Sequence, residues 1–127
     1  MCVGETQSLL PDDLPPARVF AEHPPTFDEV RQAVCDHYGI HFDYLTGRVD
    51  RHATMVKAII AYLLRRHAHM GVEEIARLVG YRNSSSVSAA ATKVDGRLTV
   101  EELLQDDIDI IKRRIAHAIL ERSAPCQ

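Results

Sequence analysis

A run of small polar residues, GYRNSSSVSAAATKV from Gly80 to Val94, combines an arginine, an asparagine and three consecutive serines directly after a glycine. Gly80 should end one helix, and Asn83 is a favoured N-cap residue for the next. The serines then occupy the first helical turn, where free backbone N–H groups and the helix dipole attract an anion such as phosphate. Their hydroxyl groups donate or accept hydrogen bonds, so they can also contact base edges.

The charge of the chain is unevenly distributed. Its 127 residues carry a net charge of −3, yet residues 48–97 hold nine basic and four acidic side chains, a net charge of +5. The basic residues are Arg48, Arg51, Lys57, Arg65, Arg66, Arg77, Arg82, Lys93 and Arg97. One face can therefore attract phosphate while the whole molecule stays mildly acidic. Composition alone leaves an ordinary solvated surface equally open.

A helix-turn-helix is predicted around the serines. The stretch VEEIARLV at 72–79 places its apolar residues on one face, and a second helix is expected from about Ser84 to Asp95. Two short helices joined by a tight glycine-containing turn can project the second helix into the major groove of DNA. The inward stripe of the second helix is Val87, Ala90, Ala91 and Val94, and the outer face of that helix is Ser85, Ser88, Ala89 and Thr92. A helical hairpin inside an ordinary all-α domain has the same spacing and remains open.

Further helical stripes surround this motif, and no strand pattern competes with them. Thr26 and Glu29 form a capping box for a helix that Gly39 ends, and one or two more turns precede Gly47. A long amphipathic helix ends near residues 67–71. A last helix is expected to begin with a second capping box, Thr99 with Glu102, and to carry an inward stripe of Leu104, Ile108, Ile111, Ile115 and Ile119. The prediction is one all-α domain of five to six helices over residues 26–122.

The two ends of the chain differ from this domain. Residues 1–25 contain five prolines and no clear period, which predicts a flexible tail, and residues 123–127 are expected to be disordered. Cys2, Cys35 and Cys126 are far apart in the sequence, which favours free thiols. The sequence shows neither a transmembrane run nor a secretory signal, so we expect a cytoplasmic protein.

From Thr26 to about Leu120 the sequence resembles the C-terminal, origin-box-binding domain of the bacterial replication initiator DnaA. That family has a basic loop, a helix of the form A-R-Q-I-A-M-Y-L, and a turn and recognition helix of the form G-x-R-D-H-[ST]-T-V-x-H-A. The corresponding stretches here are RVDRH, VKAIIAYLLRR, VEEIARLVG and GYRNSSSVSAA. The resemblance implies a Trp-repressor-like helix-turn-helix domain that binds double-stranded DNA, is associated with the nucleoid and needs no cofactor.

The resemblance also implies roles for individual residues. Arg51 and Lys57 should reach phosphates or the minor groove, and Arg82 takes the place of the family's turn arginine. The other residues expected to bind DNA are Arg48, Asn83, Ser84, Ser85, Ser86, Ser88 and Lys93. The family's Asp-His-Thr-Thr is replaced here by Asn83 and the three serines, and Ala89 replaces a histidine. The family's DNA box therefore does not follow automatically as the target.

Other chemistries find less support in the sequence. It contains no G-x-x-x-x-G-K-[ST] loop for a nucleotide and no G-x-S-x-G elbow for a nucleophile, so neither nucleotide binding nor catalysis is predicted. The groups Cys35, His37, His41 and Asp106, Asp107, Asp109, His117 do not have the spacing of a metal site. One alternative stays open, a module that binds replication or regulatory proteins and has lost specific DNA reading.

Overall fold

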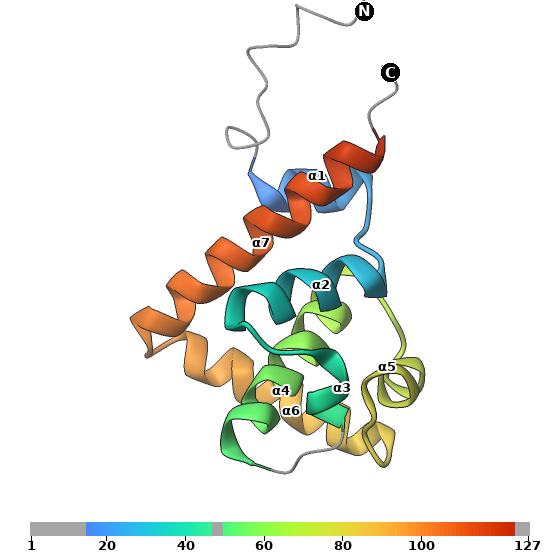
Figure 1. The fold of residues 1–127 in the computed structure, drawn as a ribbon, viewed down its shortest axis with the longest axis vertical. Coiled ribbons are helices and arrows are strands. Elements are labelled where there is room, and N and C mark those ends of the chain that lie inside the picture. The colour runs from blue at the N-terminus through green and yellow to red at the C-terminus, as the bar shows by residue number, and fades with distance from the viewer. Residues whose placement is uncertain (1–14, 47–49, 124–127) are drawn as a thin grey trace, which may run out of the picture.

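The computed structural model describes residues 15–46 and 50–123, and these residues form seven helices and no strand (Figure 1). The helices are α1 (Pro16–Glu22), α2 (Phe27–Tyr38), α3 (Phe42–Thr46), α4 (Arg51–His67), α5 (Val72–Val79), α6 (Ser84–Leu98) and α7 (Glu102–Ser123). The all-α class expected from the helical stripes is confirmed, with at least one helix more than predicted.

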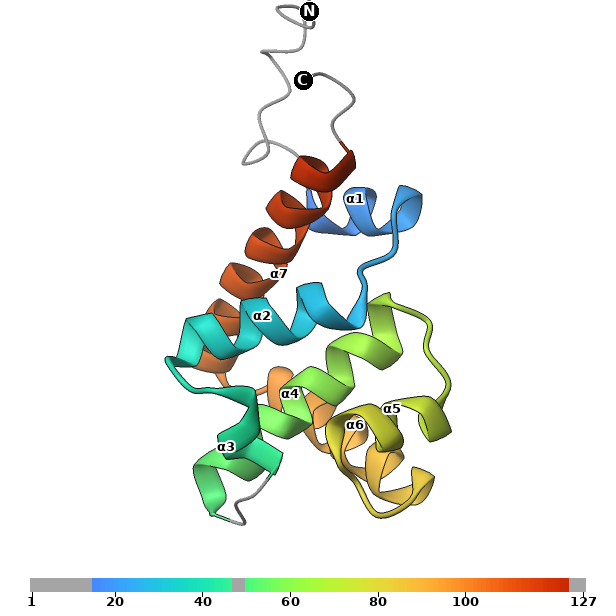
Figure 2. The ribbon, with the colours of Figure 1, turned by 45° about the vertical axis from the view of Figure 1, so that its right-hand side comes forward.

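The core is built around α4. Nine of its 17 residues are buried, so it is apolar on most sides, as a helix enclosed by its neighbours should be. It begins at Asp50, whose carboxylate accepts a hydrogen bond of 2.8 Å from the backbone N–H of Ala53. Figure 2 shows α4 between α2 and the α5–α6 pair. This position makes α4 the support against which the helix-turn-helix packs.

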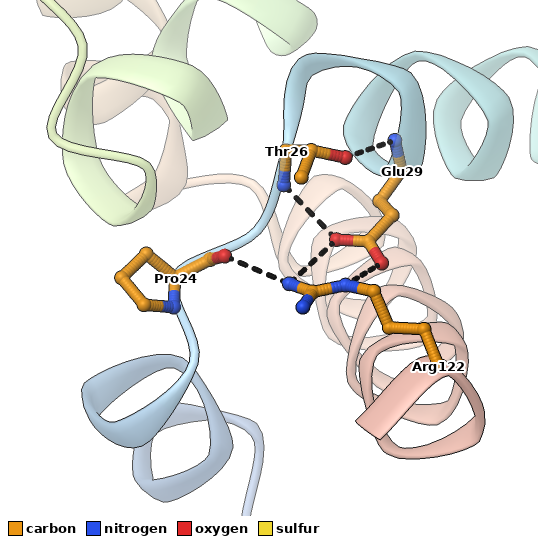
Figure 3. A network of polar contacts seen from close by, with 4 residues as sticks. All are labelled: Pro24, Thr26, Glu29 and Arg122. Carbon is orange, nitrogen blue, oxygen red and sulfur yellow. Dashed lines mark hydrogen bonds and ion pairs between the residues drawn. The ribbon is translucent and has the colours of Figure 1, made fainter. Parts of the chain in front are cut away.

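The predicted capping box of α2 is present and extends into a larger network (Figure 3). The backbone N–H of Thr26 donates to Glu29 Oε1 at 3.0 Å, and the backbone N–H of Glu29 donates to Thr26 Oγ1 at 3.2 Å. Arg122 near the end of α7 donates through Nε to Glu29 and through Nη2 to the carbonyl oxygen of Pro24. The start of α2 is thus tied to the end of α7.

The prediction of a flexible tail over residues 1–25 is wrong for residues 16–22, which form α1. Its Val19 and Phe20 are buried against the core, and the Phe20 ring lies 4.9 Å from that of His67. Burial, together with nearby cations, lowers the pKa of His67 to about 4. A helix of two turns shows too little periodicity to be detected, although proline at its first position favours a helix start. Residues 1–14 and 124–127 lie outside the described residues.

The second predicted capping box is also wrong. Thr99 follows α6, which continues to Leu98, and its backbone is helical (φ −77°, ψ −16°) rather than extended as an N-cap requires. Its hydroxyl donates to the carbonyl oxygen of Gly96 at 2.7 Å. The inward stripe predicted for the last helix is confirmed, since Leu104, Ile108, Ile111, Ile115 and Ile119 are all buried.

Gly80 ends α5 as predicted and sets the turn of the helix-turn-helix. Its φ of +96° lies in the left-handed region, which glycine alone adopts without strain. Its backbone N–H donates to the carbonyl oxygen of Ala76 at 3.0 Å, and that of Tyr81 donates to the same oxygen at 2.9 Å. This turn fixes the direction in which α6 leaves α5.

Gly80→Ala is expected to destabilise the protein by about 1–2 kcal/mol, because an added Cβ opposes the left-handed backbone. Gly96→Ala is the matched control. Gly96 lies within α6 at negative φ with open space where a Cβ would be, so alanine should stabilise by about 0.5–1 kcal/mol. Urea unfolding of the two variants measures both values. Equal effects of the two substitutions would contradict the role given to Gly80.

The described part of the chain holds neither a membrane-spanning helix nor a cluster of metal ligands. None of its helices has both the length and the apolar character needed to cross a bilayer. Among residues 15–46 and 50–123, no three histidine, cysteine, aspartate or glutamate side chains come together as metal ligands would. Cys35 is a buried free thiol, and burial raises its pKa.

Candidate nucleic-acid interface

The serine run begins the recognition helix α6, and its members have different surroundings. Asn83 is the N-cap, as predicted, and its Oδ1 accepts hydrogen bonds from the backbone N–H of Ser86 at 2.9 Å and from the Ser86 hydroxyl at 3.1 Å. Ser84 is half-buried, and Ser85 is exposed. The side chain of Ser86 therefore reinforces the cap, while that of Ser85 is open to a ligand.

The outer face of α6 is a continuous strip of small side chains. Ser85, Ser88, Ala89 and Thr92 are exposed, whereas Val87 and Val94 on the opposite side are buried. A helix with side chains of ordinary size is about 10–12 Å wide, close to the width of about 12 Å of the DNA major groove. Because the side chains on this face are short, the backbone of α6 is open to close approach along it.

A basic groove of about 720 Å³ lies beside this strip, between α4 and α6. Arg51, Lys93 and Arg97 contribute to its walls. Arg97 is held in place, since its Nε donates to Glu101 at 2.7 Å and its Nη1 lies 3.2 Å from the sulfur of Met55. Arg51 and Lys93 are exposed and form no ion pair within the described residues. These two cations remain available to a polyanion.

A second cationic position lies at the turn of the helix-turn-helix. The Nζ of Lys57 lies 4.9 Å from the ring centroid of Tyr81, close enough for a cation–π interaction. Burial raises the pKa of Tyr81 to about 12, and its hydroxyl has no hydrogen-bond partner among the described residues. Arg82, the next residue, is exposed. Tyr81 thus holds Lys57 at the turn, and Arg82 follows directly in the chain.

The structure also reveals basic residues that the sequence did not single out as site residues. Arg65, Arg66 and His69, from α4 and just beyond it, line a groove of about 740 Å³ with Thr92 and Asp95 of α6. In the sequence these residues look like an ordinary helix end. The crossing of α4 and α6 brings them beside the recognition helix. Arg48, predicted to bind DNA, lies outside the described residues.

Comparisons with known proteins agree with this geometry. Residues 27–94 match the family described as the bacterial dnaA protein helix-turn-helix. The chromosomal replication initiator protein DnaA of Herpetosiphon aurantiacus is 30% identical over 91 residues, which cover 71% of this chain and 19% of that protein. The initiator of Xanthobacter autotrophicus is 33% identical over 89 residues, 68% of this chain and 17% of that protein.

The matches cover most of this chain but only a small part of each relative. The chain spans about a fifth of the length of these relatives, and no solved structure shows a significant match. The family match runs from the start of α2 into α6 and includes the turn at Gly80, the capped serine run and the buried Val87 and Val94. The chain therefore belongs to the bacterial DnaA helix-turn-helix family.

Proposed function

We propose that this protein binds double-stranded DNA in a sequence-directed manner, with α6 lying in the major groove. The observation that carries the proposal is the exposed strip of small side chains on α6, with cations on its flanks. In this role the protein acts at the nucleoid in replication initiation, in its regulation or in control of transcription. The proposal includes no ATPase or other catalytic step, because the residues used here hold and read DNA.

Two groups of residues divide the work in this proposal. Arg51, Lys57, Arg82 and Lys93 neutralise phosphates, which supplies affinity for any duplex and fixes the position of the helix. Ser84, Ser85 and Ser88 contact base edges or phosphates, and Asn83 and Ser86 hold the first turn in shape. Hydroxyl groups both donate and accept, so the base preference should be broad or altered relative to the family.

A second candidate function follows from the substitutions on α6. Asn83, Ser84 and Ala89 stand where the family pattern has an acid and two imidazoles. Loss of these groups is expected of a module that binds replication or regulatory proteins and no longer reads DNA. Selection of binding sites from random duplex DNA separates the two candidates. An enriched motif supports sequence-directed binding, whereas uniform weak binding supports the interaction module.

Single substitutions Arg51→Ala, Lys57→Ala and Arg82→Ala are expected to weaken binding to all duplexes to a similar extent. Each removes about one phosphate contact, so the slope of log affinity against log salt concentration should become shallower by about 0.9. Fluorescence anisotropy at several salt concentrations, with two duplexes of unrelated sequence, measures the slope and the base preference together.

Arg18→Ala provides the control for these substitutions. Arg18 is an exposed arginine of α1, a helix that packs mainly against α7. Its removal should leave the salt slope unchanged. The role of the three cations would be refuted by a variant that changed the base preference while keeping the wild-type slope.

A further inference from the structure

The outer face of α7 exposes apolar side chains that no helix of the described chain covers. Leu103 is 81% exposed and Ile110 is 40% exposed, although the residues between them on the inner face are buried. In Figure 1, α2 lies below and to the right of the first half of α7, and no helix lies above and to the left of that half. Leu103, Ile110 and His117 follow one another at seven-residue intervals, so they form a single stripe along α7.

The charges along this stripe change sign at Ile110. The stretch DDIDIIKRR at 106–114 has three aspartates in its first half and three basic residues in its second half. Asp106 and Arg113 are exposed, and neither forms an ion pair with another described residue. Asp107 differs, since its carboxylate lies 3.0 Å from Nε2 of His37 on α2. Asp106 and Arg113 are thus left for a partner outside the chain.

We propose that this face of α7 binds a second copy of the same chain in an antiparallel, two-fold arrangement centred on Ile110. Such an axis places Asp106 of one copy opposite Arg113 of the other, offset by a single residue rise of about 1.5 Å. Steps of about 100° per residue put both side chains on the same flank of Ile110, which this symmetry preserves. Leu103 then meets His117 of the other copy.

The surroundings of Ile110 suit this occupant. A groove of about 660 Å³ between α2 and α7 has Ile110, Arg114 and His117 on its α7 side and Asp28 and Asp36 on its α2 side. The antiparallel arrangement brings Leu103 of the second copy to the edge of this groove. In an antiparallel pair, the second copy presents the same apolar and charged groups in the reverse order along α7. An unrelated partner would have to reproduce that order.

The association has a consequence for DNA binding. A two-fold dimer carries two α6 helices related by the same axis, and such dimers bind inverted half-sites. This consequence rests on the proposed function, but the association itself does not. Both can therefore be tested separately.

Sedimentation velocity of the full chain in the absence of DNA tests the association. Wild type is expected to show a concentration-dependent monomer–dimer equilibrium. Asp106→Arg places like charges opposite each other, and so does Arg113→Asp, so each should weaken dimerisation by at least about tenfold. An equimolar mixture of the two variants restores both opposite-charge pairs in a heterodimer and should associate as wild type does.

The mixture also serves as the folding control, because a misfolded variant could not be rescued by its counterpart. Three results would each overturn the proposal: a wild-type chain that stays monomeric up to about millimolar concentration, single variants that dimerise as wild type does, or a mixture that fails to associate. A wild-type chain that dimerises but does not bind duplex DNA would instead count against the proposed function alone.

Discussion

Ala89→Glu is expected to lower the affinity of the protein for duplex DNA by about a hundredfold or more. Ala89 lies on the exposed strip of α6 between Ser85 and Thr92, which the proposed function places in the major groove. A carboxylate there would be buried against the phosphate backbone, and like charges brought together at an interface cost several kcal/mol. Glutamate is a good helix former, so α6 itself should tolerate it. Fluorescence anisotropy with a random-sequence duplex measures the loss.

Ala17→Glu makes the same chemical change elsewhere. Ala17 is an exposed residue of α1, a helix that packs against α7 rather than α6. It alters the net charge of the protein as Ala89→Glu does, so any general electrostatic effect should be equal. We expect this control to weaken binding less than about threefold. Similar losses in the two variants would remove α6 from the DNA interface.

Much of the fold follows from local rules in the sequence. The apolar stripes of α2, α4, α5 and α6 are long enough to show a helical period, and α2, α5 and α6 each have a clear capping residue at one end or both. Thr26 and Asn83 cap their helices through the bonds expected of their side chains, and Gly39 and Gly80 end theirs in the left-handed conformation. Local chemistry decides these boundaries, so they could be predicted without tertiary information.

The errors arose where local chemistry offered two outcomes. Thr99 and Glu102 have the spacing of a capping box, but the preceding helix extends through Leu98 and uses Thr99 at its own end. The two turns of α1 bury Phe20 beside His67, a residue 47 positions further along the chain. Contacts between distant segments determine such features, and one sequence does not show them.

The candidate site could be predicted only in part, because some of its residues are brought together by contacts between distant segments. The cap at Asn83 and the exposed serines follow from helix geometry, but the neighbours of α6 depend on its crossing with α4. That crossing places Arg97 in one groove beside α6 and Arg65 with Arg66 in another. It also places Lys57 over the ring of Tyr81. A count of charges predicts that a basic face exists without predicting which cations flank the helix.

Restoring the family residues in the serine run is expected to restore family-like recognition. The triple variant Asn83→Asp, Ser84→His, Ser85→Thr should raise the affinity for the DNA box of the DnaA initiators by about ten- to a hundredfold relative to a scrambled duplex. The aspartate can accept a hydrogen bond from cytosine and the imidazole offers a second directional contact, each worth about 1–3 kcal/mol of discrimination. Parallel titrations of wild type and variant against the box and the scrambled duplex measure this ratio.

The fold should accept these three changes. Aspartate caps a helix as well as asparagine does, so its carboxylate can take over the bond from the backbone N–H of Ser86. Ser85 is exposed and Ser84 is half-buried, and neither belongs to the buried side of α6 at Val87 and Val94. Asn83→Asp alone is the matched control, because it keeps the cap and adds no imidazole, and its gain should be smaller. If the triple variant is folded and binds both duplexes as wild type does, the serine run does not face the bases. The protein-interaction module would then be the better explanation.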